Sequence, residues 1–103
     1  MTQSDGQHAI DSACKVIRQA LERAKADVYA QIRNYPPPIT ACDEQFDLLI
    51  ESRDRIVRSL HGVDELVAAC SKHPDPAALI ADFVAASPDV EDCVREQIRT
   101  LLT

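Results

Sequence analysis

Residues 70–73 read Cys-Ser-Lys-His, which is the Cys-x-x-His spacing of a local metal-ligand pair. A structural zinc site needs four thiolate or imidazole ligands in a tetrahedron, usually supplied as two such pairs. If the two long helices predicted below run antiparallel, His8 and His61 lie at the same end of the molecule as this pair. Because the chain holds only one local pair, we predict no metal or other cofactor, and Cys70 and His73 are the candidate ligands if a metal binds.

Arg53 is the other residue whose position suggests chemistry, because it falls in the middle of an apolar helix face. Its neighbours on that face are Phe46, Leu49, Ile56 and Leu60. A charged side chain there must be paired, extend to solvent or line a polar site. Four interpretations stay open: an ion pair with Glu22 on the facing helix, an aliphatic stem packed at the hairpin edge, an arginine crossing a dimer interface, or an anion-binding site.

The run from Asp43 to Val57, DEQFDLLIESRDRIV, resembles the first-helix pattern of the all-helical chorismate mutases. In that family an aspartate is followed ten residues later by an active-site arginine, with leucines between them. The resemblance implies a small all-helical enzyme in which Arg53 grips a substrate carboxylate. Elsewhere the chain departs from the family pattern. The preceding arginine falls at Pro36, the following lysine falls at Asp64, and no Asp-x-x-Arg-Glu run follows.

The four cysteines do not form a nucleophile pattern. Cys42 would lie at the start of the second helix, where a thiol pKa is lowered. A cysteine nucleophile also needs a neighbouring base, and all three histidines are predicted at the opposite end of the hairpin. We therefore interpret the cysteines as reduced thiols that pack as small apolar groups. They are Cys14, Cys42, Cys70 and Cys93.

Two long helices are predicted to position these residues, separated by Pro36-Pro37-Pro38. Proline removes a backbone donor and restricts the preceding residue, so one helix must end near Asn34 and the next can begin only after Ile39. Both segments carry apolar residues at alternating spacings of three and four, which is typical of a helical seam. The first seam is Ile10, Cys14, Ile17, Leu21, Ala24 and Val28; the second is Cys42, Phe46, Leu49, Arg53, Ile56 and Leu60.

A short connection between two such helices predicts an antiparallel hairpin of residues 5–34 and 40–61 with a proline turn at 35–39. Thr40 is the predicted N-cap of the second helix and Gly62 the residue that ends it. Facing residue numbers then sum to about 74, which pairs Val28 with Phe46 and Leu21 with Arg53.

Residues 62–103 predict two or three short helices packed across the hairpin. Asp64 would cap a helix over 65–72, Asp75-Pro76 starts one over 76–86, and Ser87-Pro88 starts one over 88–102. These helices are shorter than the first one, which spans roughly 45 Å at 1.5 Å per residue. Part of the apolar flank of the hairpin should stay uncovered, and a two-fold dimer forming a four-helix bundle would cover it.

The net charge of –6 disfavours binding to nucleic acid and to anionic membranes. No run of apolar residues is long enough for a membrane span. Residues 1–6 have neither the basic nor the apolar segment of a signal peptide, so the expected location is cytoplasmic.

Residues 1–103 are therefore predicted to form one all-α domain. The predicted function is a non-catalytic helical interaction or adaptor module that self-associates as a homodimer or binds another protein. The alternative is a small chorismate-mutase-like enzyme that binds a carboxylate substrate through Arg53.

Overall fold

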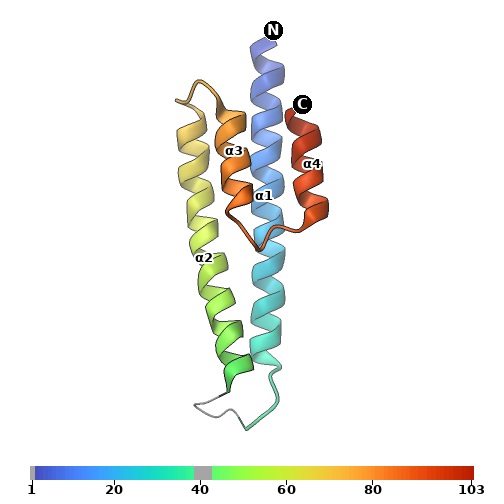
Figure 1. Cartoon of the computed structure of the whole chain (residues 1–103), viewed down its shortest axis with the longest axis vertical. Coiled ribbons are helices and arrows are strands. Elements are labelled where there is room, and N and C mark those ends of the chain that lie inside the picture. Colours follow the sequence, from blue (N-terminus) through green and yellow to red (C-terminus); the bar gives the residue numbers. More distant parts are fainter. Residues whose placement is uncertain (1, 39–42) are drawn as a thin grey trace.

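The computed structural model describes residues 2–38 and 43–103, with side chains from residue 7 onward. Within these residues the chain forms four helices and no strand: α1 (Thr2–Arg33), α2 (Glu44–Cys70), α3 (Pro76–Ala85) and α4 (Asp92–Leu102). Helices α1 and α2 form a long antiparallel hairpin, and α3 and α4 pack beside its upper half (Figure 1). The molecule measures 59 × 22 × 17 Å. The predicted all-α hairpin with short C-terminal helices is confirmed.

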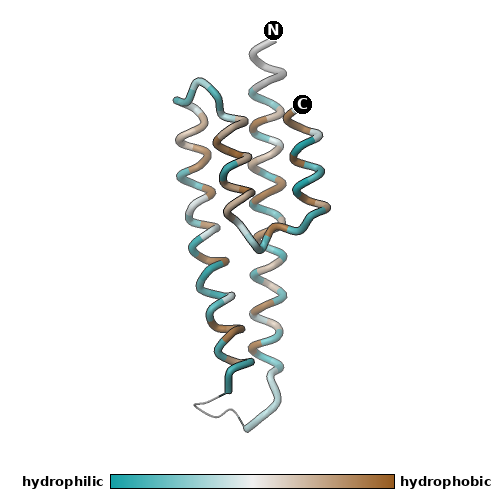
Figure 2. The backbone as a smooth tube through the Cα atoms, in the orientation of Figure 1, coloured by the Kyte–Doolittle hydropathy of each residue, from teal (hydrophilic) through white to brown (hydrophobic). Residues whose placement is uncertain are grey.

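The two short helices divide the hairpin into unlike halves. In the proximal half (residues 7–23 and 57–70), α1 packs against α2, α3 and α4, and α3 lies against both long helices. In the distal half (residues 24–36 and 43–56), neither α3 nor α4 lies over α1 and α2, and the α3–α4 loop reaches only its upper end, where Asp89 pairs with Arg55 (Figure 1). Figure 2 shows apolar residues along α3 and in a short stretch near the start of α2. That short stretch lies in the distal half.

The first predicted seam is buried almost throughout. Ile17, Leu21 and Ala13 are fully buried, and α3 and α4 add further apolar groups to the same core. These include Ile80, Val84, Val90, Val94 and Ile98. The heptad spacing therefore identified the face of α1 that packs.

Helix α2 begins and ends later than predicted. The predicted cap Thr40 and the seam residue Cys42 lie outside the described residues. Asp43 is the observed N-cap, and its Oδ1 accepts a hydrogen bond of 3.0 Å from the Phe46 backbone N–H. The helix continues through Gly62 to Cys70, so the separate helix predicted over 65–72 is the end of α2.

Gly62 has a packing role rather than a terminating one. Its φ is not positive, so it does not adopt the left-handed geometry that ends helices. A Cβ at this position would lie 3.2 Å from Cε2 of Phe83, which is tighter than ordinary contact. The missing side chain therefore lets α3 approach α2 closely.

The register of the hairpin also differs from the prediction. Arg18 forms an ion pair with Asp64, and these numbers sum to 82 instead of 74. At the turn, the rings of Tyr35 and Phe46 meet edge to face, with centroids 5.1 Å apart. Because the connection extends from Asn34 to Asp43, α2 is displaced along α1 by about 12 Å from its predicted position. The predicted pairs of Val28 with Phe46 and Leu21 with Arg53 are therefore wrong.

A tight loop of residues 86–91 separates the end of α3 from the start of α4. Asp75 caps α3 and Pro76 occupies its first turn, as predicted. The Ser87-Pro88 pair does not start α4, which begins at Asp92. Ser87 is buried instead, and its hydroxyl donates to the Phe83 carbonyl at 2.7 Å. Val90 is also buried, so residues 88–90 form a turn that anchors the loop to the core.

Candidate functional site

Arg53 and Glu22 are not brought together. The Arg53 side chain is 34% exposed, and its guanidinium pairs with the adjacent Asp54. Its Nε donates to Asp54 Oδ1 at 3.1 Å. In the observed register the position facing Arg53 on α1 is near Tyr29, about two helical turns from Glu22. Glu22 is exposed, and no ion pair among the described residues joins it to Arg53.

The histidine and cysteine side chains predicted to share one end of the molecule do not form a metal site in the described residues. His73 is exposed, and its Nδ1 accepts a hydrogen bond of 2.9 Å from the Asp75 backbone N–H. Cys70 is buried, and its thiol points to the Pro76 carbonyl at 3.8 Å. Because α2 continues to Cys70, His61 lies about 13 Å along the helix from that end. In the described residues no group of three His, Cys, Asp or Glu side chains could hold a metal ion.

Cys14 and Cys70 are neighbours in the core of the proximal half. Burial, with a further contribution from the adjacent Cys70, raises the pKa of the Cys14 thiol to about 11. Burial also raises the pKa of Cys70. Both groups are therefore protonated at neutral pH, and a protonated thiol is a poor nucleophile and a poor metal ligand.

A hollow surface lies between α1 and α2, mainly in the distal half. Two connected depressions of about 640 and 490 Å³ share Gln31, Leu49 and Ser52. We call this surface the distal groove. Its lining from α2 is Gln45, Leu48, Leu49, Ser52 and Ile56. Its lining from α1 and the residues after it is Ala20, Arg23, Ala24, Ala26, Asp27, Val28, Ala30, Gln31, Asn34, Tyr35 and Pro36. Asp89 and Glu91 of the α3–α4 loop border its upper end.

Leu48 is the most exposed large apolar residue among the described side chains, at 61%. It lines the distal groove. The sequence predicted an uncovered apolar flank but did not single out this residue. The available signal was the run Leu48-Leu49-Ile50, because three consecutive apolar residues of a helix cannot all face one neighbouring helix.

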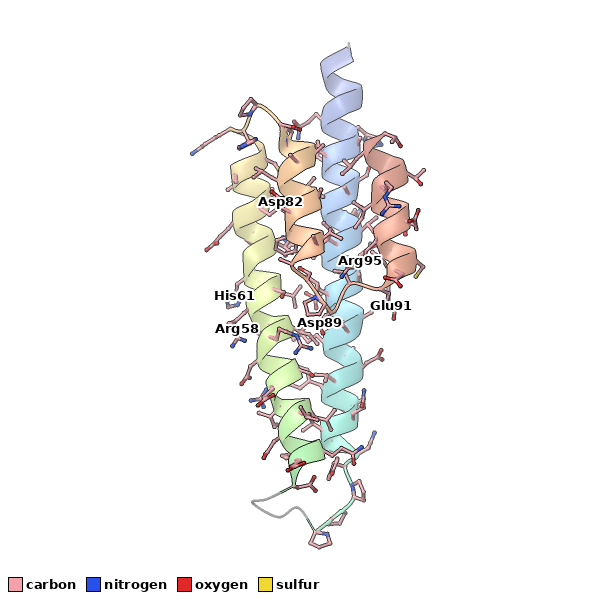
Figure 3. The ribbon with its side chains drawn as sticks, viewed as in Figure 1. Arg58, His61, Asp82, Asp89, Glu91 and Arg95 are labelled. Carbon is pink, nitrogen blue, oxygen red and sulfur yellow. The ribbon has the colours of Figure 1, made fainter. Side chains whose placement is uncertain are left out.

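A pair of ionic and polar contacts fixes the loop at the upper end of the groove (Figure 3). Arg55 donates from Nε and from one terminal nitrogen to the two carboxylate oxygens of Asp89, both at 2.8 Å. Asp89 is only 12% exposed. Arg95 donates to the carbonyls of Val90 and Ser87 at 3.0 and 2.8 Å. We call the Arg55–Asp89 ion pair the clamp. Sequence reasoning missed it because the two residues are far apart in the chain.

The lower end of the groove is closed by a polar contact across the turn. The Tyr35 hydroxyl donates to Asp43 Oδ1 at 2.7 Å. The Phe46 N–H and then the Tyr35 hydroxyl lower the pKa of the Asp43 carboxyl. The same carboxylate raises the pKa of the Tyr35 phenol. Side-chain contacts therefore fix the loops at both ends of the distal groove, and the surface between them is not covered by another helix of the described chain.

A smaller hollow of about 330 Å³ lies between α3 and α4. Its walls are mainly apolar, and Arg95 and Arg99 lie at its edge. Arg95 already donates to backbone carbonyls, and Arg99 pairs with Glu96. Arg53 lines neither this hollow nor the distal groove.

In the part of the chain that the structure describes, no helix combines the length and the apolarity needed to cross a membrane. Comparisons with protein-family models, with curated proteins and with solved structures find no match to this chain.

Proposed function

We propose that this chain is a helical interaction module that self-associates through the distal half of its hairpin. The proposal rests on one observation: α3 and α4 cover only one half of the hairpin formed by α1 and α2. The proximal half is covered by α3 and α4, whereas the distal half leaves a groove and a 61% exposed Leu48. A second copy would supply the missing layer and complete a four-helix bundle.

The size of the distal groove supports a weak but specific dimer. From Ala20 to Pro36 it spans about 24 Å along α1. Because two helices side by side are about 20 Å wide, the distal half offers a flat face of roughly 500 Å² per copy, or about 1,000 Å² in total. That total is near the lower limit for specific interfaces, so we expect a weak dimer that dissociates on dilution.

The composition supports a protein partner in a reducing compartment. A net charge of –6 is unfavourable for binding phosphate backbones. Three of the four cysteines are described, and all three are free thiols. Free thiols fit a cytoplasmic location, where disulfides are rare.

The structure offers the carboxylate-binding enzyme no specific support. Arg53 is paired with Asp54, and the hollows between the helices do not include it. The Arg53 position that carried the resemblance to chorismate mutases therefore lacks a surrounding pocket in the described residues. We propose only the interaction module.

Sedimentation velocity over a dilution series tests this proposal with two matched variants of α2. Leu48→Lys places a charge in the distal groove, and the expected result is a dissociation constant at least about 10-fold weaker. Val67→Lys changes an apolar residue that is 43% exposed in the proximal half, and it should dimerise like the wild type. A wild-type chain that stays monomeric at millimolar concentration would contradict the proposal, as would equal weakening by both variants.

A further inference from the structure

We infer that two copies pack antiparallel with their distal grooves facing each other, so that the hairpin turn of each copy meets the α3–α4 loop of the other. This inference rests on the proposed self-association and adds the orientation of the partner. It follows from the position of α3, from the dimensions of the groove and from the charges at its two ends.

The position of α3 excludes a parallel arrangement of facing grooves. In the proximal half α3 lies against both α1 and α2, and the loop after it crosses α1 at the upper end of the distal groove (Figure 1). The distal groove therefore continues the groove in which α3 lies. Two parallel copies would bring their α3 helices into contact first. Because a helix with side chains is about 10 Å thick, the distal grooves would then be held apart.

An antiparallel copy avoids this collision. The distal half of the second copy lies in the same layer as α3 and α4 of the first copy. The turn of the second copy then meets the α3–α4 loop of the first. The level of Gln31, Leu49 and Ser52, which belong to both depressions, lies near the middle of the groove. A two-fold axis through this level places each of these residues next to its own counterpart, as in any isologous interface.

The charges at the ends of the groove favour the same orientation. The upper end is lined by Arg23, Asp27, Asp89 and Glu91, whereas the lower end is lined by the amides Asn34 and Gln45 and lies beside the Asp43 carboxylate, which accepts from Tyr35. In a parallel dimer the charged side chains of both upper ends would lie at one level, with more carboxylates than guanidinium groups, and like charges across an interface oppose association. In the antiparallel dimer the amides of Asn34 and Gln45 face the charged end, where they can donate to a carboxylate or accept from a guanidinium, and the Asp43 carboxylate keeps its Tyr35 partner.

The shape of the dimer follows from this overlap. Each copy is 59 Å long, and the copies share only the distal half of about 24 Å, so the assembly should be about 95 Å long. Small-angle X-ray scattering should show this elongated form. A dimer about as long as one copy would contradict the inference.

Photo-crosslinking tests the orientation directly. Gln45 is replaced by the photoreactive residue p-benzoylphenylalanine, and ¹⁴N- and ¹⁵N-labelled chains are mixed so that intermolecular products are recognised by mass. The expected products join position 45 to tryptic peptides 19–23 or 73–95 of the other copy, which contain Arg23 and the α3–α4 loop. Products that join position 45 only to peptide 34–53 would show a parallel dimer and overturn the inference.

Two further crosslinking probes distinguish a wrong orientation from a failure of self-association. A second probe at Asn34 gives an independent answer if the substitution at Gln45 disturbs the start of α2. A probe at Val67 is the matched control and should give no intermolecular product. If sedimentation shows a dimer while neither distal probe crosslinks, the orientation is wrong and self-association stands. If the chain is monomeric, both proposals fail.

Discussion

The proximal and distal halves of the hairpin are made from the same two helices but differ in what covers them. In the proximal half Ala13, Ile17 and Val63 are fully buried, while in the distal half only Val28 and Ile56 are buried among the described residues. The apolar spacing is similar in both halves. What differs is that α3 and α4, at 10 and 11 residues, do not extend along the whole of α1. A regular seam therefore becomes a core or a surface according to the length of the helices packed on it.

This comparison assigns different physical roles to the two halves. Stability should come mainly from the proximal half, where the four helices bury a shared core. The proposed self-association uses the distal half, where apolar surface such as Leu48 is exposed.

The largest expected effect is the difference between two identical substitutions on α1. Ile17→Ala removes a fully buried side chain in the proximal half and should lower the free energy of unfolding by about 2–5 kcal/mol. Ile32→Ala removes a partly buried side chain in the distal half and should cost less than half as much. Urea unfolding below the dissociation constant of the dimer measures both values. Equal losses would show that the halves do not differ in this way.

A second prediction concerns the clamp at the boundary between the halves. Arg55→Gln leaves the carboxylate of Asp89, 12% exposed, without its cation. We expect a loss of about 1–2 kcal/mol, less than for a fully buried pair, because Arg55 itself is 41% exposed and screened by water. Thermal and urea unfolding measure the loss. Arg58→Gln, at an exposed position on the same helix, is the control and should change stability by less than about 0.5 kcal/mol. A similar loss in both variants would argue against the clamp.

The smallest expected effect lies at the distal turn and is a change in pKa. Asp43→Asn keeps a good N-cap but removes the carboxylate that binds the Tyr35 hydroxyl. The pKa of Tyr35 should therefore fall toward its ordinary value of 10.0. A tyrosine titration by NMR measures this shift. An unchanged Tyr35 pKa would show that the hydroxyl does not bind Asp43 in solution.

The sign of the pH dependence at this turn follows from the two shifts. The Asp43 pKa is lowered from 3.8, so its stabilising contribution is present above that value and is lost as the pH falls through the lowered pKa. The Tyr35 pKa is raised from 10.0, so its contribution is present below that value and is lost as the pH rises through the raised pKa. The turn contact should thus be fully formed between about pH 4 and pH 10.

Local patterns in the sequence predicted the elements, and long-range contacts decided how they meet. The three prolines located the end of α1, and the seam identified Ile10, Ile17 and Leu21 as core residues. The end of α2 could not be predicted from Gly62 alone, because its role depends on the Phe83 ring of another helix. The hairpin register failed for a related reason. The side-chain contacts across the turn, such as Tyr35 with Asp43, have no local signature.

The candidate site was predicted only in outline. The lengths of the helices predicted that some apolar flank would remain uncovered, but they did not locate the distal groove. Its position depends on where the α3–α4 loop crosses the hairpin, and Arg55 and Asp89 fix that crossing. A contact between residues so far apart in the chain becomes visible only once the helices are packed.

The buried thiols of Cys14 and Cys70 allow the opening of the proximal half to be measured by their rate of alkylation. Alkylating reagents attack the thiolate, and both thiols are shielded within the proximal half. They can react only during transient exposure of that half, whereas Cys93 is exposed and should react at once. The rates at which Cys14 and Cys70 are alkylated, measured on their separate tryptic peptides, therefore record how often the four-helix region comes apart, without any engineered label.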